Sequence, residues 1–265
     1  MAFNHVRERW REGLPAISGW MTSACPLVAE TLAAAGFDAV IIDMQHSATT
    51  LEDAVRLAAV IELRGAEPFV RIPSLDHALM GKLVDLGITG IIVPMVESRN
   101  MADALVSAVR YPPLGSRSVG PRRPKWRFGE DYCSNASETI VTLAMIETSR
   151  GFDALEEIAT TSGLDGIFVG PADLKISLAG GAAASASDSD IEDAIAAIRT
   201  RTWSAGCRAG IFGASTDTAA RRLREGFDFV SATPDLVCVA EGATRDLELL
   251  RCPTYPEDQV GAARH

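Results

Sequence analysis

The chain has 265 residues, of which 47% are hydrophobic and 23% are charged, and these proportions are typical of a soluble globular domain. No apolar run approaches the roughly 20 residues of a membrane-spanning helix. The formal net charge of -10 argues against a nucleic-acid partner, because binding phosphates requires a basic surface. We expect one domain over residues 1–265, since barrels of about 250 residues form a single domain.

The cysteines and the N-terminus indicate a cytoplasmic protein. The first ten residues, MAFNHVRERW, lack the apolar core of a signal peptide. The cysteines show no CxxC spacing, which argues against a zinc–thiolate site and fits a reducing compartment. They are Cys25, Cys133, Cys207, Cys238 and Cys252.

Short apolar runs alternate along the chain with Ala- and Leu-rich stretches of helical periodicity. This alternation is typical of parallel strands joined by crossover helices, and eight such units suit a closed (β/α)8 TIM barrel. The main rival is an open doubly wound sheet, but the Gly-rich phosphate fingerprint expected after its first strand is absent. The expected strands are Ala16–Met21, Ala39–Asp43, Phe69–Ile72, Gly90–Met95, Thr142–Glu147, Gly166–Val169, Arg208–Phe212 and Phe227–Ser231. The expected helices include Leu51–Leu63, Asp76–Leu86, Met101–Arg110, Gly151–Thr160, Asp190–Ala205 and Asp217–Glu225.

Two segments interrupt this rhythm. Tyr111–Ala136 is longer than an ordinary loop and is rich in Pro, Gly and Arg, whereas Gly180–Ser189 is typical of a flexible surface connection. The first segment contains a basic cluster that is either solvated or in contact with another subunit, or that attracts an anionic substrate. This cluster comprises Arg117, Arg122, Arg123, Lys125 and Arg127.

Polar residues terminate several of the expected strands, and in a parallel barrel the reactive groups lie at these carboxyl ends. An acid in such a position can simply cap the next helix, which is an equal alternative for Asp173 and Asp235. Asp43 and Glu147 directly follow buried apolar runs, where a carboxylate without a cation carries a large desolvation cost. The full set is Asp43 at the end of strand two with Gln45 and His46 after it, Arg71 in strand three, Glu147 at the end of strand five, Gly170, Pro171, Ala172 and Asp173 after strand six, and Ser231 at the end of strand eight with Asp235 after it.

Glu147 and Asp173 follow adjacent strands, so their carboxylates should lie close together. Like charges at that separation require a shared proton or a bound cation. Oxygen ligands favour Mg²⁺ or Mn²⁺, and an open site also accepts Co²⁺, Ni²⁺ or Zn²⁺. The alternative of two unrelated helix caps stays open on this reasoning alone.

Six segments, spread nearly end to end, together resemble the 4-hydroxy-2-oxoheptanedioate aldolase (HpcH/HpaI) family. This is a family of class II pyruvate aldolases in the pyruvate kinase-like, phosphoenolpyruvate-binding barrel superfamily. The segments are FDAVIIDMQHS (37–47), FVRIP (69–73), LVDLGITGIIVP (83–94), RYPPLGSRSV (110–119), MIETSRG (145–151) and LDGIFVGPADL (164–174).

The resemblance implies that Glu147 and Asp173 bind the metal, which chelates the carboxylate and keto oxygens of a 2-oxo acid. It implies that Arg71 stabilises the enolate oxygen, a role suited to a permanently charged guanidinium. An alternative for Arg71 is a structural bridge between carboxylates. Asp43 is expected to orient Arg71 or a water on the metal.

The resemblance also implies that His46 is the catalytic histidine and that Asp85 raises its basicity. The pair would act on the aldol hydroxyl through water, for which a histidine is well suited near neutral pH. The backbone of Ala172 and Asp173 would bind the substrate carboxylate at a helix N-terminus, with Gly170 and Pro171 shaping the turn.

The chain departs from well-known family members at two positions, since Gln45 replaces a Glu and Met145 replaces a common substrate-contacting Gln. Both differences alter the pocket and leave the substrate more open than the reaction. The motif DMQHS (43–47) resembles hydroxyketoacid aldolases, which use pyruvate or hydroxypyruvate as nucleophile with an aldehyde. The family also implies a homo-oligomer, usually a hexamer built as a trimer of dimers that exchange a C-terminal helix.

Five other functions compete with this interpretation. A Schiff-base aldolase needs a lysine on a barrel strand, and of the three lysines only Lys175 is a candidate. The same scaffold supports acyl-CoA lyases of the citramalyl or malyl type, oxaloacetate-type decarboxylases and phosphoenolpyruvate mutases. A silent barrel that serves as a scaffold is disfavoured by the presence of Arg71, Glu147 and Asp173 together.

Overall fold

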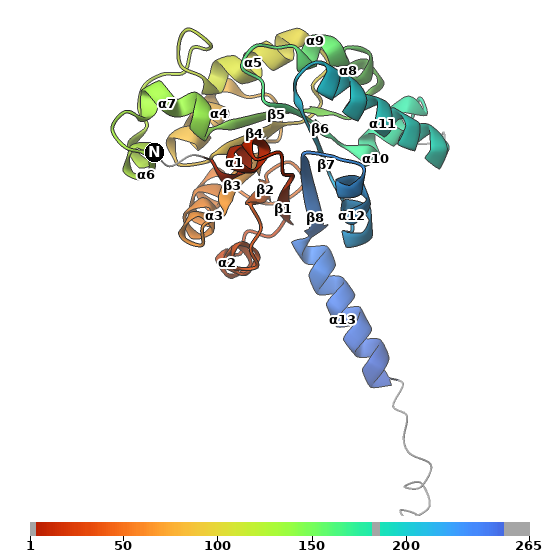
Figure 1. Cartoon of the computed structure of the whole chain (residues 1–265). Coiled ribbons are helices and arrows are strands. Elements are labelled where there is room, and N and C mark those ends of the chain that lie inside the picture. The colour runs from red at the N-terminus through yellow and green to blue at the C-terminus, as the bar shows by residue number, and fades with distance from the viewer. Residues whose placement is uncertain (1–3, 182–185, 252–265) are drawn as a thin grey trace, which may run out of the picture.

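In the computed structural model, which describes residues 4–181 and 186–251, eight parallel strands close into a barrel in chain order. Strand β8 pairs with β1, so the described sheet closes on itself (Figure 1). The strands are β1 Ala16–Met21, β2 Ala39–Asp43, β3 Glu67–Arg71, β4 Gly90–Val93, β5 Val141–Ile146, β6 Gly166–Val169, β7 Arg208–Ile211 and β8 Phe229–Pro234. This confirms the expected (β/α)8 TIM barrel; β1, β2 and β6 have the expected bounds, and the shifted ends of the other strands differ by one to three residues.

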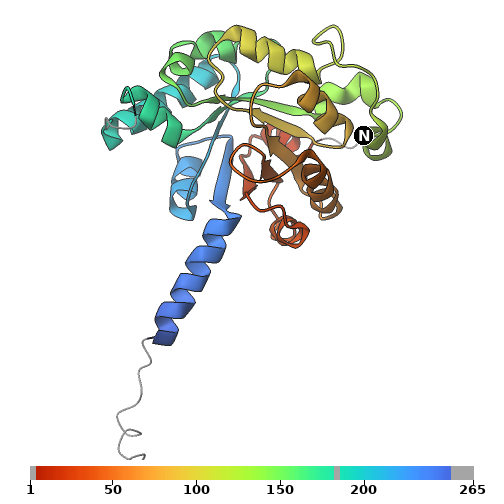
Figure 2. The same cartoon turned by 180° about the vertical axis from the view of Figure 1, so that it is seen from behind.

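Helices surround the barrel on its outer face (Figures 1 and 2). Most begin at a Ser, Thr, Asp or Asn whose side chain accepts a backbone N–H of the first turn, as Thr50 does for Asp53. The helices are α1 His5–Arg11, α2 Pro26–Ala34, α3 Leu51–Leu63, α4 His77–Asp85, α5 Arg99–Val109, α6 Arg122–Phe128, α7 Tyr132–Thr139, α8 Ser149–Asp153, α9 Leu155–Ala159, α10 Pro171–Leu178, α11 Asp188–Ser204, α12 Thr216–Arg224 and α13 Asp235–Arg251.

The apolar core has two layers because successive strand residues point alternately inward and outward. On β2, Ile41 belongs to the cluster inside the barrel, whereas Val40 and Ile42 pack against the outer helices. Glycine makes room for the inner rings: a Cβ on Gly90 would lie 2.2 Å from the ring of Phe69. Large aromatic side chains can therefore fill the barrel interior.

Helix α1 covers the N-terminal end of the strands. Val6 and Trp10 are buried in the inner cluster, and the indole N–H of Trp10 donates to the carbonyl of Asp228 at 2.8 Å. The Asn4 amide, which caps α1, donates to the carbonyls of Thr89 and Thr139 at 3.1 and 3.2 Å. Helix α1 therefore closes this end of the barrel interior.

The segment Tyr111–Ala136, expected to be a long loop, contains helix α6 and the first part of α7. Ion pairs hold α6 in place: Arg127 bonds to the buried Glu67 of β3 at 2.8 Å, and Arg123 to Glu62 of α3 at 2.7 Å. These pairs link residues 60 or more positions apart, so no local periodicity could have indicated the helices. The middle of the expected connection at 180–189 lies outside the described residues.

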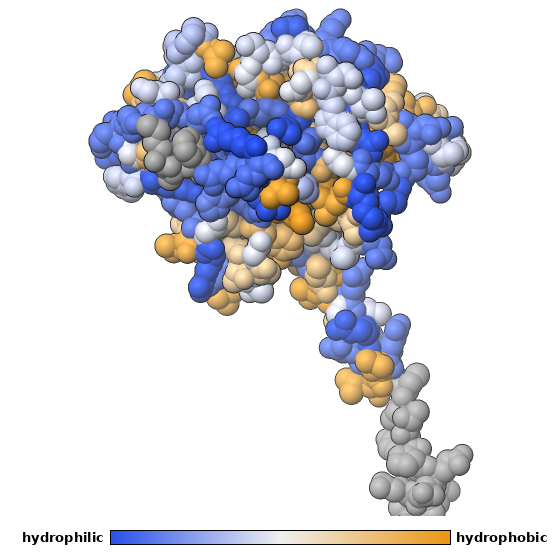
Figure 3. Space-filling view, in the orientation of Figure 1, coloured by the Kyte–Doolittle hydropathy of each residue, from blue (hydrophilic) through white to orange (hydrophobic). Residues whose placement is uncertain are grey.

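Helix α13 leaves the carboxyl end of β8 and projects away from the barrel in both views (Figures 1 and 2). Asp235, its first residue, is its sole buried residue. Leu247, Leu249 and Leu250 expose 46 to 78% of their surface at the far end of the helix, where Figure 3 shows an apolar patch. Neither α13 nor any other described helix combines the length and apolarity needed to cross a membrane.

Candidate active site

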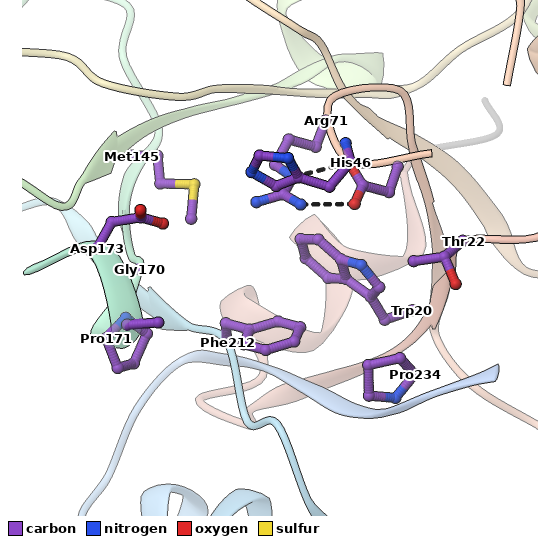
Figure 4. Close-up of a pocket in the computed structure, with 12 residues that line it drawn as sticks. Trp20, Thr22, His46, Arg71, Met145, Gly170, Pro171, Asp173, Phe212 and Pro234 are labelled. Atoms are coloured by element: carbon purple, nitrogen blue, oxygen red, sulfur yellow. Dashed lines mark hydrogen bonds and ion pairs between the residues drawn. The ribbon is translucent and has the colours of Figure 1, made fainter. Parts of the chain in front are cut away.

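A cavity of about 260 Å³ opens at the carboxyl ends of the strands (Figure 4), and four of the polar residues that the sequence singles out line it: Asp43, His46, Arg71 and Asp173. Arg71 and Asp43 come from neighbouring strands β3 and β2, and Asp173 comes from the start of α10 on the facing side. The lining residues are Trp20, Thr22, Asp43, His46, Arg71, Met145, Gly170, Pro171, Ala172, Asp173, Phe212 and Pro234.

Arg71 is fixed by Asp43. Its Nε and Nη2 donate to the two carboxylate oxygens of Asp43 at 2.9 and 2.5 Å, and its guanidinium lies 4.7 Å from the centre of the Trp20 ring. Both side chains of this ion pair are buried, with 9% and 1% of their surface exposed. Within the described residues no acceptor bonds to Nη1 of Arg71. This nitrogen can therefore donate to an anionic ligand in the cavity.

Asp43 also organises the loop that carries His46. Its Oδ1 accepts the backbone N–H groups of Gln45 and His46 at 3.0 and 3.3 Å. The His46 side chain is exposed and lines the cavity, whereas the Gln45 side-chain oxygen is buried and has no partner within the described chain. Asp43 therefore couples the position of Arg71 to that of His46.

Glu147 lies behind the cavity wall. Its Oε1 accepts the backbone N–H of Met95 at 2.8 Å, and Met95 adopts a φ of 55°, which L-residues rarely do. A Cβ on Gly170 would lie 2.4 Å from Glu147 Oε2, so glycine at this position gives the carboxylate access to the cavity. Burial raises the pKa of Glu147 to about 7; Asp173 adds to this effect, while the Met95 N–H and Arg71 oppose it.

This donor set fits a divalent cation. The Glu147 carboxylate is 1% exposed, and no Lys, Arg or His forms an ion pair with it in the described part of the chain. Glu147 and Asp173 offer only oxygen donors, and no third acidic, His or Cys side chain joins them in residues 4–181 and 186–251. Mg²⁺ is commonly bound by one or two carboxylates, with substrate and water oxygens filling the remaining positions.

The N-terminus of α10 borders the same cavity. Gly170 is its N-cap, Pro171 occupies the first turn, and the first N–H to bond back within the helix is that of Leu174, to the Gly170 carbonyl. The N–H groups of Ala172 and Asp173 are therefore left for another acceptor, and a helix N-terminus favours an anion. The carboxylate-binding role expected for these residues stays a prediction, and these N–H groups are the donors that it requires.

Asp85 lies at the other end of the barrel. It is the last residue of α4, which runs from the end of β3 back to the start of β4, whereas His46 follows the end of β2. The Asp85 carboxylate bonds to Arg117 at 2.6 Å. The expected contact between Asp85 and His46 is absent within the described chain, because a crossover helix returns its last residue to the N-terminal side of the strands.

Lys175 does not reach the cavity. It lies on α10 and pairs with Asp188 at 2.6 Å, and no lysine is among the described residues that line the cavity. A Schiff-base nucleophile is therefore missing from the described site.

Trp20, Thr22, Phe212 and Pro234 also line the cavity but escaped sequence reasoning. Polar residues at strand ends are the usual signal of a reactive site in a parallel barrel, and three of these four residues are apolar. Trp20 lies near the end of β1, Phe212 follows β7, and Pro234 ends β8, so their place at carboxyl ends was the available signal. Trp20, Phe212 and Pro234 form an apolar wall of the cavity (Figure 4).

Comparisons with known proteins agree with this geometry. The family profile "HpcH/HpaI aldolase/citrate lyase" matches residues 17–241. The chain is 46% identical to a hydroxypyruvate/pyruvate aldolase of Rhizorhabdus wittichii over 240 residues, which cover 91% of this chain and 96% of the relative. It is 32% identical to a 2-dehydro-3,6-dideoxy-6-sulfogluconate aldolase of Pseudomonas putida over 249 residues, or 93% and 96% of the two chains.

Among solved structures, an HpcH/HpaI aldolase/citrate lyase family protein from Burkholderia cenocepacia superimposes with a TM-score of 0.86 at 29% identity. The match covers 94% of this chain and 100% of that one. The sequence match and the structural match both run through the barrel and its cavity. The chain therefore belongs to the HpcH/HpaI aldolase/citrate lyase family and is a carbon–carbon lyase.

Proposed function

We propose that this enzyme catalyses reversible aldol cleavage and addition between a 2-oxo acid, pyruvate or hydroxypyruvate, and an aldehyde. The observation that carries the proposal is the shared cavity of Arg71, His46 and Asp173, with Glu147 behind its wall. The substrate class is supported by the name of the 46% identical relative. The P. putida relative acts on a different substrate by its name, so the aldehyde stays open.

Each side chain has a role that follows from its contacts. The N–H groups of Ala172 and Asp173 bind the carboxylate of the 2-oxo acid, and Nη1 of Arg71 donates to the oxygen that becomes negative in the enolate. Glu147 and Asp173 would hold a divalent cation, Mg²⁺, Mn²⁺ or Co²⁺, with Ni²⁺ or Zn²⁺ as alternatives, which supplies Lewis-acid stabilisation of the same charge. Trp20 and Phe212 exclude water beside Arg71.

Proton transfer to and from the aldol hydroxyl is assigned to His46, assisted by Asp85 of a second copy of the chain. The two residues lie at opposite ends of one barrel, and both are accessible: His46 is exposed and the Asp85 side chain is 31% exposed. A contact between copies is therefore the way in which they can form a pair. The projecting α13, with its uncovered leucines, fits a hexamer of three dimers that exchange this helix.

The metal requirement is tested by exhaustive chelation followed by addition of single cations. Cleavage of the aldol product should vanish with EDTA and return with Mg²⁺, Mn²⁺ or Co²⁺. Aldol addition of pyruvate and of hydroxypyruvate to a panel of aldehydes, run with each cation, then identifies the substrates. Full turnover after chelation would contradict the role of Glu147 and Asp173.

The pairing between copies is tested by complementation. His46→Ala and Asp85→Asn should each slow aldol cleavage, while decarboxylation of oxaloacetate, which needs an enolate but no aldol deprotonation, should persist. Co-expression of the two variants creates sites with His46 from one copy and Asp85 from another, so cleavage should recover in the mixed oligomers. No recovery in oligomers shown to contain both variants would refute the pairing.

We favour the aldolase over a CoA-dependent lyase, although the family name also covers citrate lyases. The basic cluster was the candidate site for a CoA phosphate. Lys125 pairs with Glu130, Arg123 with Glu62, and Arg127 with Glu67. These three cations are paired with carboxylates, which weakens their attraction for a phosphate, whereas Arg122 is exposed and forms no ion pair within the described residues.

A further inference from the structure

Arg117, the first residue of the basic cluster, is buried rather than solvated. Its side chain is 1% exposed, and the guanidinium lies 4.7 Å from the centre of the Tyr111 ring and 5.5 Å from that of Tyr132. Its Nη1 donates to the Tyr132 hydroxyl at 2.9 Å, and its Nη2 donates to Asp85 Oδ1 at 2.6 Å. Both ends of the guanidinium are therefore engaged.

This arrangement is more specific than a surface ion pair. A buried cation requires compensation, and Asp85 is the one carboxylate that bonds to Arg117 within the described residues. Burial works against the charge, but Tyr132 and Asp85 outweigh it and raise the pKa of Arg117. The guanidinium is thus a permanent positive charge held in place by two aromatic rings.

The contact immobilises one oxygen of Asp85 and leaves the other available. No described donor bonds to Oδ2, which lies 3.4 Å from where a Cβ on Gly120 would be. The Asp85 side chain is 31% exposed and borders a surface cavity of about 230 Å³. One carboxylate oxygen is anchored on a rigid support while the carboxylate remains accessible from outside the chain.

We propose that Arg117 is a positioning residue, which holds Asp85 ready to act on His46 of a second copy of the chain. The inference rests on the proposed pairing of these two residues between copies. Rigid placement matters because a base is effective only within hydrogen-bond reach of its partner, and a free aspartate side chain would sample several rotamers. The same network ties the segment from Tyr111 to Tyr132 to the end of α4.

Lysine cannot replace arginine here. A single ammonium group lacks the planar fork that reaches Tyr132 and Asp85 at once while stacking on Tyr111. Arg117→Lys keeps the positive charge but cannot form both hydrogen bonds of the guanidinium. The variant therefore distinguishes the positioning of Asp85 from the neutralisation of its charge. Tyr132→Phe is a milder second variant that removes only the hydroxyl bonded to Nη1.

The experiment compares two reactions of the metal-loaded oligomer, aldol cleavage and oxaloacetate decarboxylation. Arg117→Lys should lower kcat for cleavage about 10-fold or more, part of the ~10²–10⁴-fold that general acid–base catalysis supplies, and leave decarboxylation nearly unchanged. Tyr132→Phe should show the same selectivity with a smaller loss. Arg123→Lys is the matched control, because Arg123 lies in the same segment as Arg117 but pairs with Glu62 instead of Asp85. It should affect neither reaction.

A double-mutant cycle with Asp85→Asn completes the test. If Arg117 acts through Asp85, adding Arg117→Lys to Asp85→Asn should cause no further loss of cleavage. Equal loss of both reactions in Arg117→Lys and Tyr132→Phe, or additive losses in the cycle, would overturn the inference. Light scattering compares the oligomeric state of each variant with that of the wild type, so that loss of the oligomer is detected separately.

The positioning role and the pairing between copies predict different results for these variants. If Asp85→Asn lowers cleavage selectively but neither Arg117→Lys nor Tyr132→Phe does, the pairing stands and the positioning role is wrong. If Asp85→Asn has no selective effect on cleavage, the pairing is wrong and the positioning role is wrong with it.

Discussion

Replacing Arg71 by alanine separates the two roles that the sequence left open for this residue. The side chain forms a buried bidentate ion pair with Asp43 and also lines the cavity with Nη1 unpaired among the described residues. A purely structural arginine would affect stability alone, whereas a residue that stabilises the enolate would also control turnover. Both effects are expected here.

The expected magnitudes follow from the environment. The Asp43 side chain is 1% exposed, and Arg71→Ala removes the cation that neutralises it. Breaking a buried ion pair in this way lowers the free energy of unfolding by about 3–5 kcal/mol. For a chain of this size that lowers Tm by about 6–20 °C, at roughly 2–4 °C per kcal/mol. Loss of a donor to the developing oxyanion should lower kcat by a further ~10²–10³-fold.

Calorimetric unfolding measures the change in Tm, and kinetics at saturating metal and well below Tm measure the change in kcat. The double variant Asp43→Asn/Arg71→Ala provides the control: without a buried charge it should recover part of the stability but none of the kcat. A kcat within about threefold of wild type for Arg71→Ala would assign the residue a structural role.

Three further predictions concern the surroundings of the site. Gly170→Ala should weaken Mn²⁺ binding about 10-fold or more in calorimetric titration, because the added Cβ would lie 2.4 Å from Glu147 Oε2; unchanged affinity would contradict the proposed ligand. Lys175→Ala should keep full turnover, and borohydride with pyruvate should leave the wild-type lysine unmodified, whereas a reduced adduct would restore the Schiff-base mechanism. Burial opposes ionisation of Asp235, but hydrogen bonds from Ser23 and Thr22 outweigh it and lower its pKa. Asp235→Ala should therefore lower the free energy of unfolding by about 2–4 kcal/mol at pH 7. The difference in stability between the wild type and the variant should shrink as the pH falls below about 4, because the carboxyl of the unfolded chain is protonated at a higher pH than that of the folded chain. A difference in stability that does not change with pH would exclude this linkage.

The sequence by itself determined the barrel and the catalytic end of the strands. Parallel strands buried on both faces require continuous apolar runs, so Ala39–Asp43 and Gly166–Val169 could be located to the residue. Because the carboxyl ends of all eight strands face one side, the polar residues that terminate them had to converge. Asp43, His46, Arg71 and Asp173 do line one cavity.

The tertiary structure alone decided which partners these residues have. Asp85 was expected beside His46, yet the direction of α4 carries it to the opposite end of the barrel, where it meets Arg117. Arg117 looked like surface charge because its partners, Tyr132 and Asp85, are 15 and 32 residues away in the chain. The local pattern of apolar and polar residues indicates which face of a helix or strand is buried. A contact between side chains far apart in the sequence depends instead on how the helices and strands pack together. That packing is fixed by the whole core rather than by any segment of the sequence.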